Sequence, residues 1–224
     1  MRVASDQSSP PSGFTPELAG FVFLPEADGC GGNVYRRARA TFCSRTDPAY
    51  AGQVDPLKLG ELIVRRDADR ELLEVRVYRG RPESTKDPRT YAAHMRQCAA
   101  HASRGASRVS VITRSLRYPG GWPSTPAEEK GIDVALAVDF VMMAVRNEYD
   151  VGVIMSTDTD LKPALEAVHT LHGSQYPRCE VAAWQRSADK SRRLSVPGGG
   201  IWCHWLHEAD YASVADSTDY NVAR

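Results

Sequence analysis

The stretch Val151-Gly152-Val153-Ile154-Met155-Ser156-Thr157-Asp158-Thr159-Asp160-Leu161-Lys162-Pro163 decides the fold of this chain. Its first five residues are mostly apolar and β-forming, and a polar cluster follows them, which predicts a strand that ends in a loop. Leu161, Leu165 and Val168 then recur at helical spacing. Pro163 fits the first turn of that helix, because its missing N–H has no partner there. The stretch therefore predicts a strand, a loop and a helix in succession.

Two carboxylates, Asp158 and Asp160, lie in the predicted loop. In an open α/β sheet, ligands bind at the loops that leave the carboxyl ends of the strands. One interpretation is purely structural: Asp160 or Thr159 caps the helix and Asp158 closes the turn. However, like charges about 4 Å apart repel by about 4 kcal/mol at an effective dielectric constant of ~20. A bound divalent cation would relieve this repulsion, so we predict a metal site here.

Length and composition limit the possible architectures. The chain has 224 residues, with 28 Lys and Arg balancing 28 Asp and Glu. We predict a single domain over residues 19–224, preceded by a disordered lead over residues 1–18 that is polar and rich in Ser and Pro. Because the net charge is zero, a polyanion would have to bind to a local basic patch.

The cysteine pattern argues against a disulfide framework. The five cysteines are odd in number and form no C-x-x-C pair, which also disfavours structural zinc and indicates a reducing compartment. We predict that Cys203 and His204 pack in the core. No signal peptide or long apolar span is present, so we expect a soluble, cytoplasmic protein with no membrane partner.

The rest of the chain alternates between helical and strand patterns. We predict strands over residues 20–24, 73–78, 108–112, 179–184 and 201–206, and helices over residues 34–42, 55–62, 91–103 and 128–145. Such alternation is typical of an α/β fold with a mostly parallel sheet. The second half of segment 128–145 is apolar almost all round, which predicts a helix buried against the sheet.

That apolar helix contains two acids, Asp133 and Asp139. A buried carboxylate is costly unless it is paired or bound to a metal. The two acids lie roughly 240° apart around a helix at ~100° per residue, so they cannot point the same way. We expect only Asp133 to reach a metal site, although capping and the helix dipole also account for an acid at this position.

The motifs resemble those of a known family. Lys130-Gly131-Ile132-Asp133-Val134-Ala135, followed by Ser156-Thr157-Asp158-Thr159-Asp160-Leu161 with Pro163 beyond, resembles the NYN family of PIN-like ribonuclease domains. Gly32-Asn33-Val34-Tyr35 resembles the first motif of that family. The resemblance extends from about residue 20 to about residue 220. It implies a Rossmann-like, three-layer αβα fold and metal-dependent cleavage of RNA.

The resemblance also implies roles for particular residues. Asp133, Asp158 and Asp160 would hold Mg²⁺ or Mn²⁺ through oxygen ligands, a donor type that suits both ions. The residues expected to orient water or contact the phosphate are Asn33, Lys130, Ser156 and Thr157. Apart from the resemblance, positive charge predicts contact with RNA by Arg36, Arg37, Arg39 and the run Arg186, Lys190, Arg192 and Arg193, with Trp184 as a stacking face beside the run. Ordinary solvated surface is the alternative for the basic run.

One motif departs from the family pattern. The family opens with Asp-Gly-x-Asn at the end of the first strand, whereas this chain has Cys30-Gly31-Gly32-Asn33, with Asp28 two residues further upstream. Either an inserted loop lets Asp28 serve as a fourth ligand, or Cys30 has replaced the acid and the metal is held less firmly.

Two other functions compete with the nuclease interpretation. Cys30 at the place of the family's first Asp favours a catalytically impaired PIN-like module with an RNA-binding or regulatory role. A phosphohydrolase of the haloacid dehalogenase type would also use an Asp-x-Asp after an apolar strand, as in Asp158-Thr159-Asp160. That nucleophile normally opens its domain, however, and here only the last third of the chain follows it.

Overall fold

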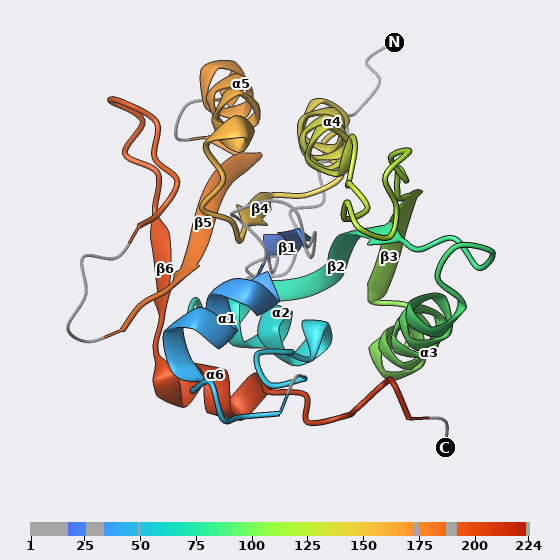
Figure 1. Cartoon of the computed structure of the whole chain (residues 1–224). Coiled ribbons are helices and arrows are strands. Elements are labelled where there is room, and N and C mark those ends of the chain that lie inside the picture. Colours follow the sequence, from blue (N-terminus) through green and yellow to red (C-terminus); the bar gives the residue numbers. More distant parts are fainter. Residues whose placement is uncertain (1–17, 26–33, 49, 173–174, 187–191, 223–224) are drawn as a thin grey trace, which may run out of the picture.

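The computed structural model describes residues 18–25, 34–48, 50–172, 175–186 and 192–222. The chain folds into six strands and seven helical segments within these residues: β1 (Leu18–Pro25), α1 (Val34–Phe42), α2 (Pro56–Val64), β2 (Arg70–Arg81), α3 (Pro88–Gly105), β3 (Val109–Ser115), α4 (Ile132–Val145), β4 (Val151–Ile154), the 3₁₀ turn η1 (Thr159–Leu161), α5 (Lys162–His172), β5 (Arg178–Trp184), β6 (Cys203–Leu206) and α6 (Glu208–Val214) (Figure 1).

All six strands form one parallel sheet in the order β3-β2-β1-β4-β5-β6. The chain builds the sheet outward from β1 through β2 to β3, then crosses back to place β4 on the other side of β1. The order of the strands therefore reverses between β1 and β4, where Val22 pairs with Val153. In such sheets, the crevice at this switch point is where ligands bind.

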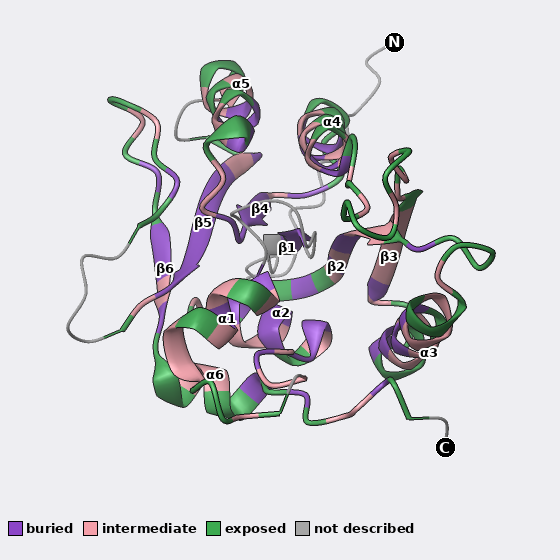
Figure 2. Ribbon diagram, viewed as in Figure 1, coloured by how far each residue is buried: buried purple, intermediate pink, exposed green. Residues whose placement is uncertain are grey.

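Helices cover both faces of the sheet (Figure 1). Helices α4 and α5 pack on one face around a core that includes Phe23, Phe140 and Leu165. Helices α1, α2 and α6 pack on the other face around a second core that includes Val22 and Leu59, and α3 lies beside α2. Figure 2 shows the buried residues concentrated in the strands and on the inner sides of these helices. The predicted three-layer αβα fold with a parallel sheet is confirmed.

Side-chain caps explain where two of the helices begin. The Asp55 side chain accepts a hydrogen bond from the Lys58 N–H, and Pro56 occupies the first helical position. At the start of α3, the Asp87 side chain accepts a hydrogen bond from the Thr90 N–H. An acceptor at the N-cap followed by proline satisfies N–H groups that have no partner within the helix.

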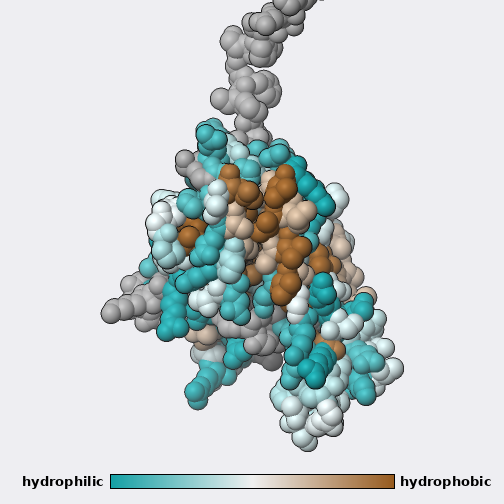
Figure 3. Space-filling model, turned by 90° about the horizontal axis from the view of Figure 1, so that it is seen from above, coloured by the Kyte–Doolittle hydropathy of each residue, from teal (hydrophilic) through white to brown (hydrophobic). Residues whose placement is uncertain are grey.

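The prediction for segment 128–145 is wrong in two respects. The helix begins only at Ile132, because Gly131 takes a left-handed conformation (φ 75°) and Glu128 forms an antiparallel bridge with Arg117. The helix is also not buried all round. An apolar stripe faces outward on α4; its members, with their exposed fractions, are Val134 (64%), Val138 (53%), Met142 (40%) and Val145 (52%). Figure 3, which views the molecule from the side of α4 and α5, shows this hydrophobic surface.

Several other expectations concern the chain as a whole. No helix among the described residues is long and apolar enough to span a membrane. Cys43, Cys98, Cys179 and Cys203 are all free thiols. Nearly all of the predicted disordered lead lies outside the described residues, as does Lys190.

Candidate active site

The loop after β4 emerges at the switch point of the sheet. β1 ends at Pro25 and β4 at Ile154, and the Met155 N–H donates to the carbonyl oxygen of Phe23 at 3.1 Å, so the two strands stay paired to the edge. Residues 156–160 follow directly. The predicted acidic loop therefore lies at the carboxyl edge, between the two strands where the sheet reverses its order.

A chain of local hydrogen bonds shapes this loop. Buried Ser156 accepts a bond from the Asp158 N–H through its Oγ at 3.0 Å, and Asp158 Oδ1 accepts one from the Asp160 N–H at 3.0 Å. Asp158 thus caps the 3₁₀ turn that leads into α5. The capping residue is Asp158, not Asp160 or Thr159 as one interpretation of the sequence had it. Asp158 is half-buried and Asp160 is exposed.

Asp133 is brought to the same edge by α4. This helix runs from the carboxyl end of β3 to the amino end of β4, so its first turn lies at the carboxyl edge and it contacts η1. Asp133 is the second residue of the helix and is half-buried. The N-cap, Gly131, has no side chain, so an acid in the first turn also stabilises the helix through its dipole.

The three acids share an edge, but they do not form a closed metal cage. Within the described ranges, no group of three or more His, Cys, Asp or Glu side chains is arranged to hold a metal ion. Asp28, Cys30 and Asn33 lie outside those ranges.

The second acid of α4, Asp139, has a structural role. It accepts hydrogen bonds from the Tyr78 hydroxyl at 2.8 Å and from Arg76 Nη1 at 3.3 Å, which join α4 to β2. Burial, together with the bond to Asp139, raises the pKa of Tyr78 well above its ordinary value. Asp139 is thus engaged away from the acidic loop.

The predicted cationic residues differ in exposure. Lys130, Arg36 and Arg186 are exposed; Lys130 lies 3.8 Å from Glu128. Arg37 is half-buried. Arg39 instead uses its guanidinium to hold a loop, donating to the carbonyl oxygens of residues 47, 48 and 51. Arg39 thus has a structural role, and its contact with RNA stays a prediction.

The predicted stacking role of Trp184 is wrong. Its side chain is only 8% exposed and its Nε1–H donates to the carbonyl oxygen of Val34 at 3.1 Å. Its ring packs edge to face against Phe42. Trp184 anchors α1 to the sheet, and its indole face is not available to a base.

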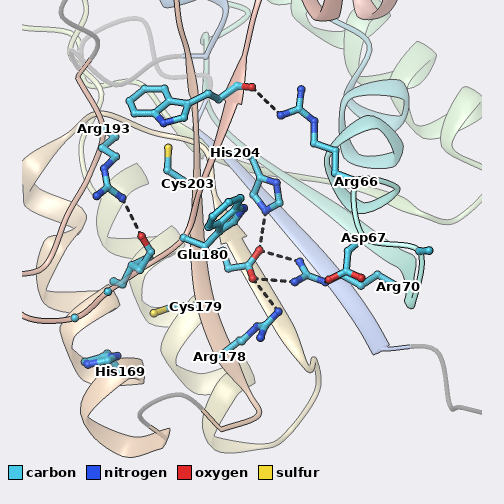
Figure 4. Close-up of a pocket in the computed structure, with 16 residues that line it drawn as sticks. Arg66, Asp67, Arg70, His169, Arg178, Cys179, Glu180, Arg193, Cys203 and His204 are labelled. Atoms are coloured by element: carbon cyan, nitrogen blue, oxygen red, sulfur yellow. Dashed lines mark hydrogen bonds and ion pairs between the residues drawn. The ribbon is translucent and has the colours of Figure 1, made fainter.

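A buried ionic cluster at the opposite, amino edge of the sheet has no counterpart in the predictions from sequence (Figure 4). Glu180 accepts two hydrogen bonds from Arg70, at 2.8 and 3.0 Å, and one from His204 at 2.7 Å, and Arg178 lies 3.2 Å away. Burial alone would raise the pKa of Glu180, but the bonds from His204 and Arg70 outweigh burial and lower it to about 2. The signal in the sequence is one charged residue inside the apolar run Cys179–Trp184.

His204 and Cys203 are buried, as predicted, but His204 is paired with Glu180 and does not simply pack among apolar groups. Together with neighbouring side chains they line a cavity of about 990 Å³.

Comparison with known proteins gives the family. The model for the NYN domain matches residues 33–190, which is more than half of the chain and includes the segments that carry Asp133, Asp158 and Asp160. The chain belongs to the NYN domain family. This family is part of the PIN-like superfamily, and NYN domains are generally nucleases.

A solved structure is similar in fold. The crystal structure of a protein of unknown function, VPA0982 from Vibrio parahaemolyticus, aligns with a TM-score of 0.51 and 15% identity over 88% of this chain and 97% of that one. At this identity the likeness supports the NYN domain's fold alone. No curated protein matches significantly.

Proposed function

We propose that this NYN domain is a metal-dependent ribonuclease that hydrolyses phosphodiester bonds of RNA at the carboxyl edge of its sheet. The observation that carries the proposal is the position of Asp158 and Asp160 at the β1–β4 switch point, with Asp133 at the same edge. Acids placed there in a nuclease family are where phosphodiester chemistry is expected.

The donor set suits a hard divalent cation. Asp133, Asp158 and Asp160 offer only oxygen ligands, which Mg²⁺ and Mn²⁺ prefer over thiolate or imidazole. One oxygen of Asp158 is held by the Asp160 N–H, which orients the carboxylate and directs its second oxygen elsewhere. When bound, the ion would supply an activated water and neutralise charge on the phosphate.

The protein's own groups would position the substrate. Ser156 is buried and organises the loop through the Asp158 N–H, so its role is to hold the carboxylate in place. Lys130 is exposed immediately before α4 and would attract the phosphate by its charge. Asn33 and Thr157 would orient water or a phosphate oxygen, and Asp28 would complete the ligand set.

One observation favours a second function, RNA binding without cleavage. The described residues contain no group of three potential ligands arranged around one point. A domain that held its metal poorly would still bind RNA through its exposed arginines but would not cleave it. The phosphohydrolase alternative has no comparable support, because the Asp-x-Asp follows the fourth strand and not the first.

The test is cleavage of a labelled single-stranded RNA. We expect cleavage only when Mg²⁺ or Mn²⁺ is added, and we expect Asp158→Asn to lower the rate by about 100-fold or more. Asp69→Asn is the matched control, since Asp69 is an exposed acid in the turn before β2, at the opposite edge. Cleavage without metal, or full activity of Asp158→Asn, would contradict the proposal. RNA binding without cleavage by the parent protein would establish the second function.

A further inference from the structure

The cavity at the amino edge is far from the acidic loop and unlike it in chemistry. It is formed where three strands begin: its walls come from the turn before β2, the start of β5 and the start of β6, together with the segment that precedes β6. Figure 4 shows the lining side chains on both sides of β5 and β6: Arg193, Cys179 and Cys203 lie on one side, and Arg70, Glu180 and His204 on the other. At about 990 Å³, the cavity is at the upper end of the range for small-molecule sites.

Positive charge prevails among the residues that line this cavity. Four of them are arginines, Arg66, Arg70, Arg178 and Arg193, whereas the acids are Asp67 and Glu180. Asp210 lies beside the cavity and pairs with Arg66. Even with all three acids ionised, one guanidinium charge remains without a carboxylate. A surplus cation in a hollow site favours an anionic ligand.

The floor of the cavity is rigid. The side chains of Arg70 and Glu180 are only 5% and 4% exposed, and they are joined by a two-bond ion pair. This pair fixes Arg178, whose guanidinium also lies 5.1 Å from the centre of the Tyr176 ring. The Arg178 side chain is 31% exposed, so its positive charge acts on a ligand in the cavity although its Nε is buried.

Arg193 reaches the cavity from the opposite wall. Its Nη1 donates to the carbonyl oxygen of Ile201 at 2.8 Å, and the residue is otherwise exposed. It forms no ion pair within the described part of the chain. Its remaining N–H groups are therefore available to an oxyanion, in the fork geometry that suits phosphate.

An exposed aromatic ring stands beside these arginines. Trp202 is 66% exposed, and its indole packs edge to face against His204 at 6.4 Å. The contact fixes the ring while leaving much of its surface in solvent. A fixed, exposed indole provides a flat face on which a nucleobase can stack.

We propose that this cavity binds a nucleoside phosphate, with the base against Trp202 and the phosphate held by Arg193. The ligand is either a free mononucleotide or one nucleotide of an RNA strand, since both present a base and a phosphate. The site is separate from the acidic loop and does not depend on catalysis there.

The first experiment is a calorimetric titration with AMP in the presence of EDTA. We expect a Kd below about 1 mM, and a loss of at least about tenfold in Trp202→Ala and in Arg193→Gln. Both side chains are exposed, so the variants should fold. Arg65→Gln, at an arginine that is 75% exposed and outside the cavity, is the control and should bind as the parent does. Adenosine and inorganic phosphate should each bind more weakly than AMP.

The second experiment distinguishes a free mononucleotide from a nucleotide of an RNA strand as the ligand. Anisotropy of a labelled RNA of about ten nucleotides, again in EDTA, is measured for the parent and the same variants. Weakening of RNA binding by about tenfold in both cavity variants assigns the site to the strand; unchanged RNA binding together with impaired AMP binding assigns it to free nucleotide. The proposal is overturned if neither ligand is affected by the two substitutions. Because no step measures cleavage, failure here leaves the proposed nuclease activity untouched.

Discussion

Asp158 connects stability and function in a single side chain. It caps the turn that leads into α5 and is also the acid that we expect to hold the metal. Substitutions can separate the two roles, because asparagine retains a capping oxygen and alanine does not.

We predict that Asp158→Asn abolishes cleavage and keeps the stability of the parent, whereas Asp158→Ala abolishes cleavage and lowers the free energy of unfolding by about 1 kcal/mol. Removing the charge of Asp158, which repels neighbouring Asp160, should offset any small loss in the asparagine variant. Urea denaturation of the metal-free proteins measures the difference. Unfolding of Asp158→Asn would mean that the residue is structural only.

The second residue-scale prediction concerns Glu180. Its pKa is lowered to about 2 in the folded protein, from an ordinary value of 4.5. A lowered carboxyl pKa contributes stability above pH 4.5, and this contribution is lost as the pH falls from 4.5 towards 2.

Glu180→Gln should therefore lower the free energy of unfolding by about 3 kcal/mol at pH 7, because it leaves Arg70 without its buried partner. The difference from the parent should shrink as the pH falls through that window. Glu148→Gln, in an exposed pair with Arg146, is the control and should cost little at any pH. A constant difference across the window would contradict the assigned pKa.

At the scale of elements, α4 separates hydrophobicity from burial. Its inner residues, among them Leu136, are fully buried, whereas Val138 on the outer stripe is 53% exposed. We predict that Leu136→Ala lowers the free energy of unfolding by about 2–4 kcal/mol and that Val138→Ala changes it by less than about 0.5 kcal/mol. Chemical denaturation of both variants checks this. A large cost at Val138 would show that the outer stripe is covered in solution.

The same helix shows what the sequence could and could not predict. Strands and helices were predictable because each apolar run ends at a polar or glycine-rich break, and the Asp55–Pro56 cap is a local signal. The outer stripe of α4 was not predictable, because apolar residues on every side of a helix carry no information about which side is covered. The predicted stacking role of Trp184 was wrong for a similar reason: its neighbours in sequence are basic, but its neighbours in space are Val34 and Phe42.

The acidic loop and the Glu180 cluster also differ in how far the sequence predicts them. The acidic loop is contiguous in sequence, so its position after β4 could be predicted from one stretch. Glu180 pairs with Arg70, 110 positions away, and with His204, 24 positions away, and no local pattern predicts such pairing.

At the scale of the whole molecule, a neutral chain must bind RNA through local charge. Arg36 and Arg186 are exposed near the carboxyl edge, at the start of α1 and after β5. We predict that RNA affinity falls with salt and that Arg36→Gln or Arg186→Gln each reduces the log–log slope by about 0.7, the value for one phosphate contact on a single strand. Arg65→Gln should leave the slope unchanged. A flat salt response of the parent protein would contradict electrostatic binding at this edge.

The central claim is that Asp133, Asp158 and Asp160 hold a divalent ion at the switch point. Anomalous scattering from crystals soaked in Mn²⁺ tests it most directly. The account predicts a peak about 2.0–2.3 Å from an Asp158 oxygen, with Asp133 and Asp160 bound to the ion directly or through water, and with either Asp28 or Cys30 at the remaining position. A peak only elsewhere, or no peak at a Mn²⁺ concentration that supports cleavage, would contradict the account.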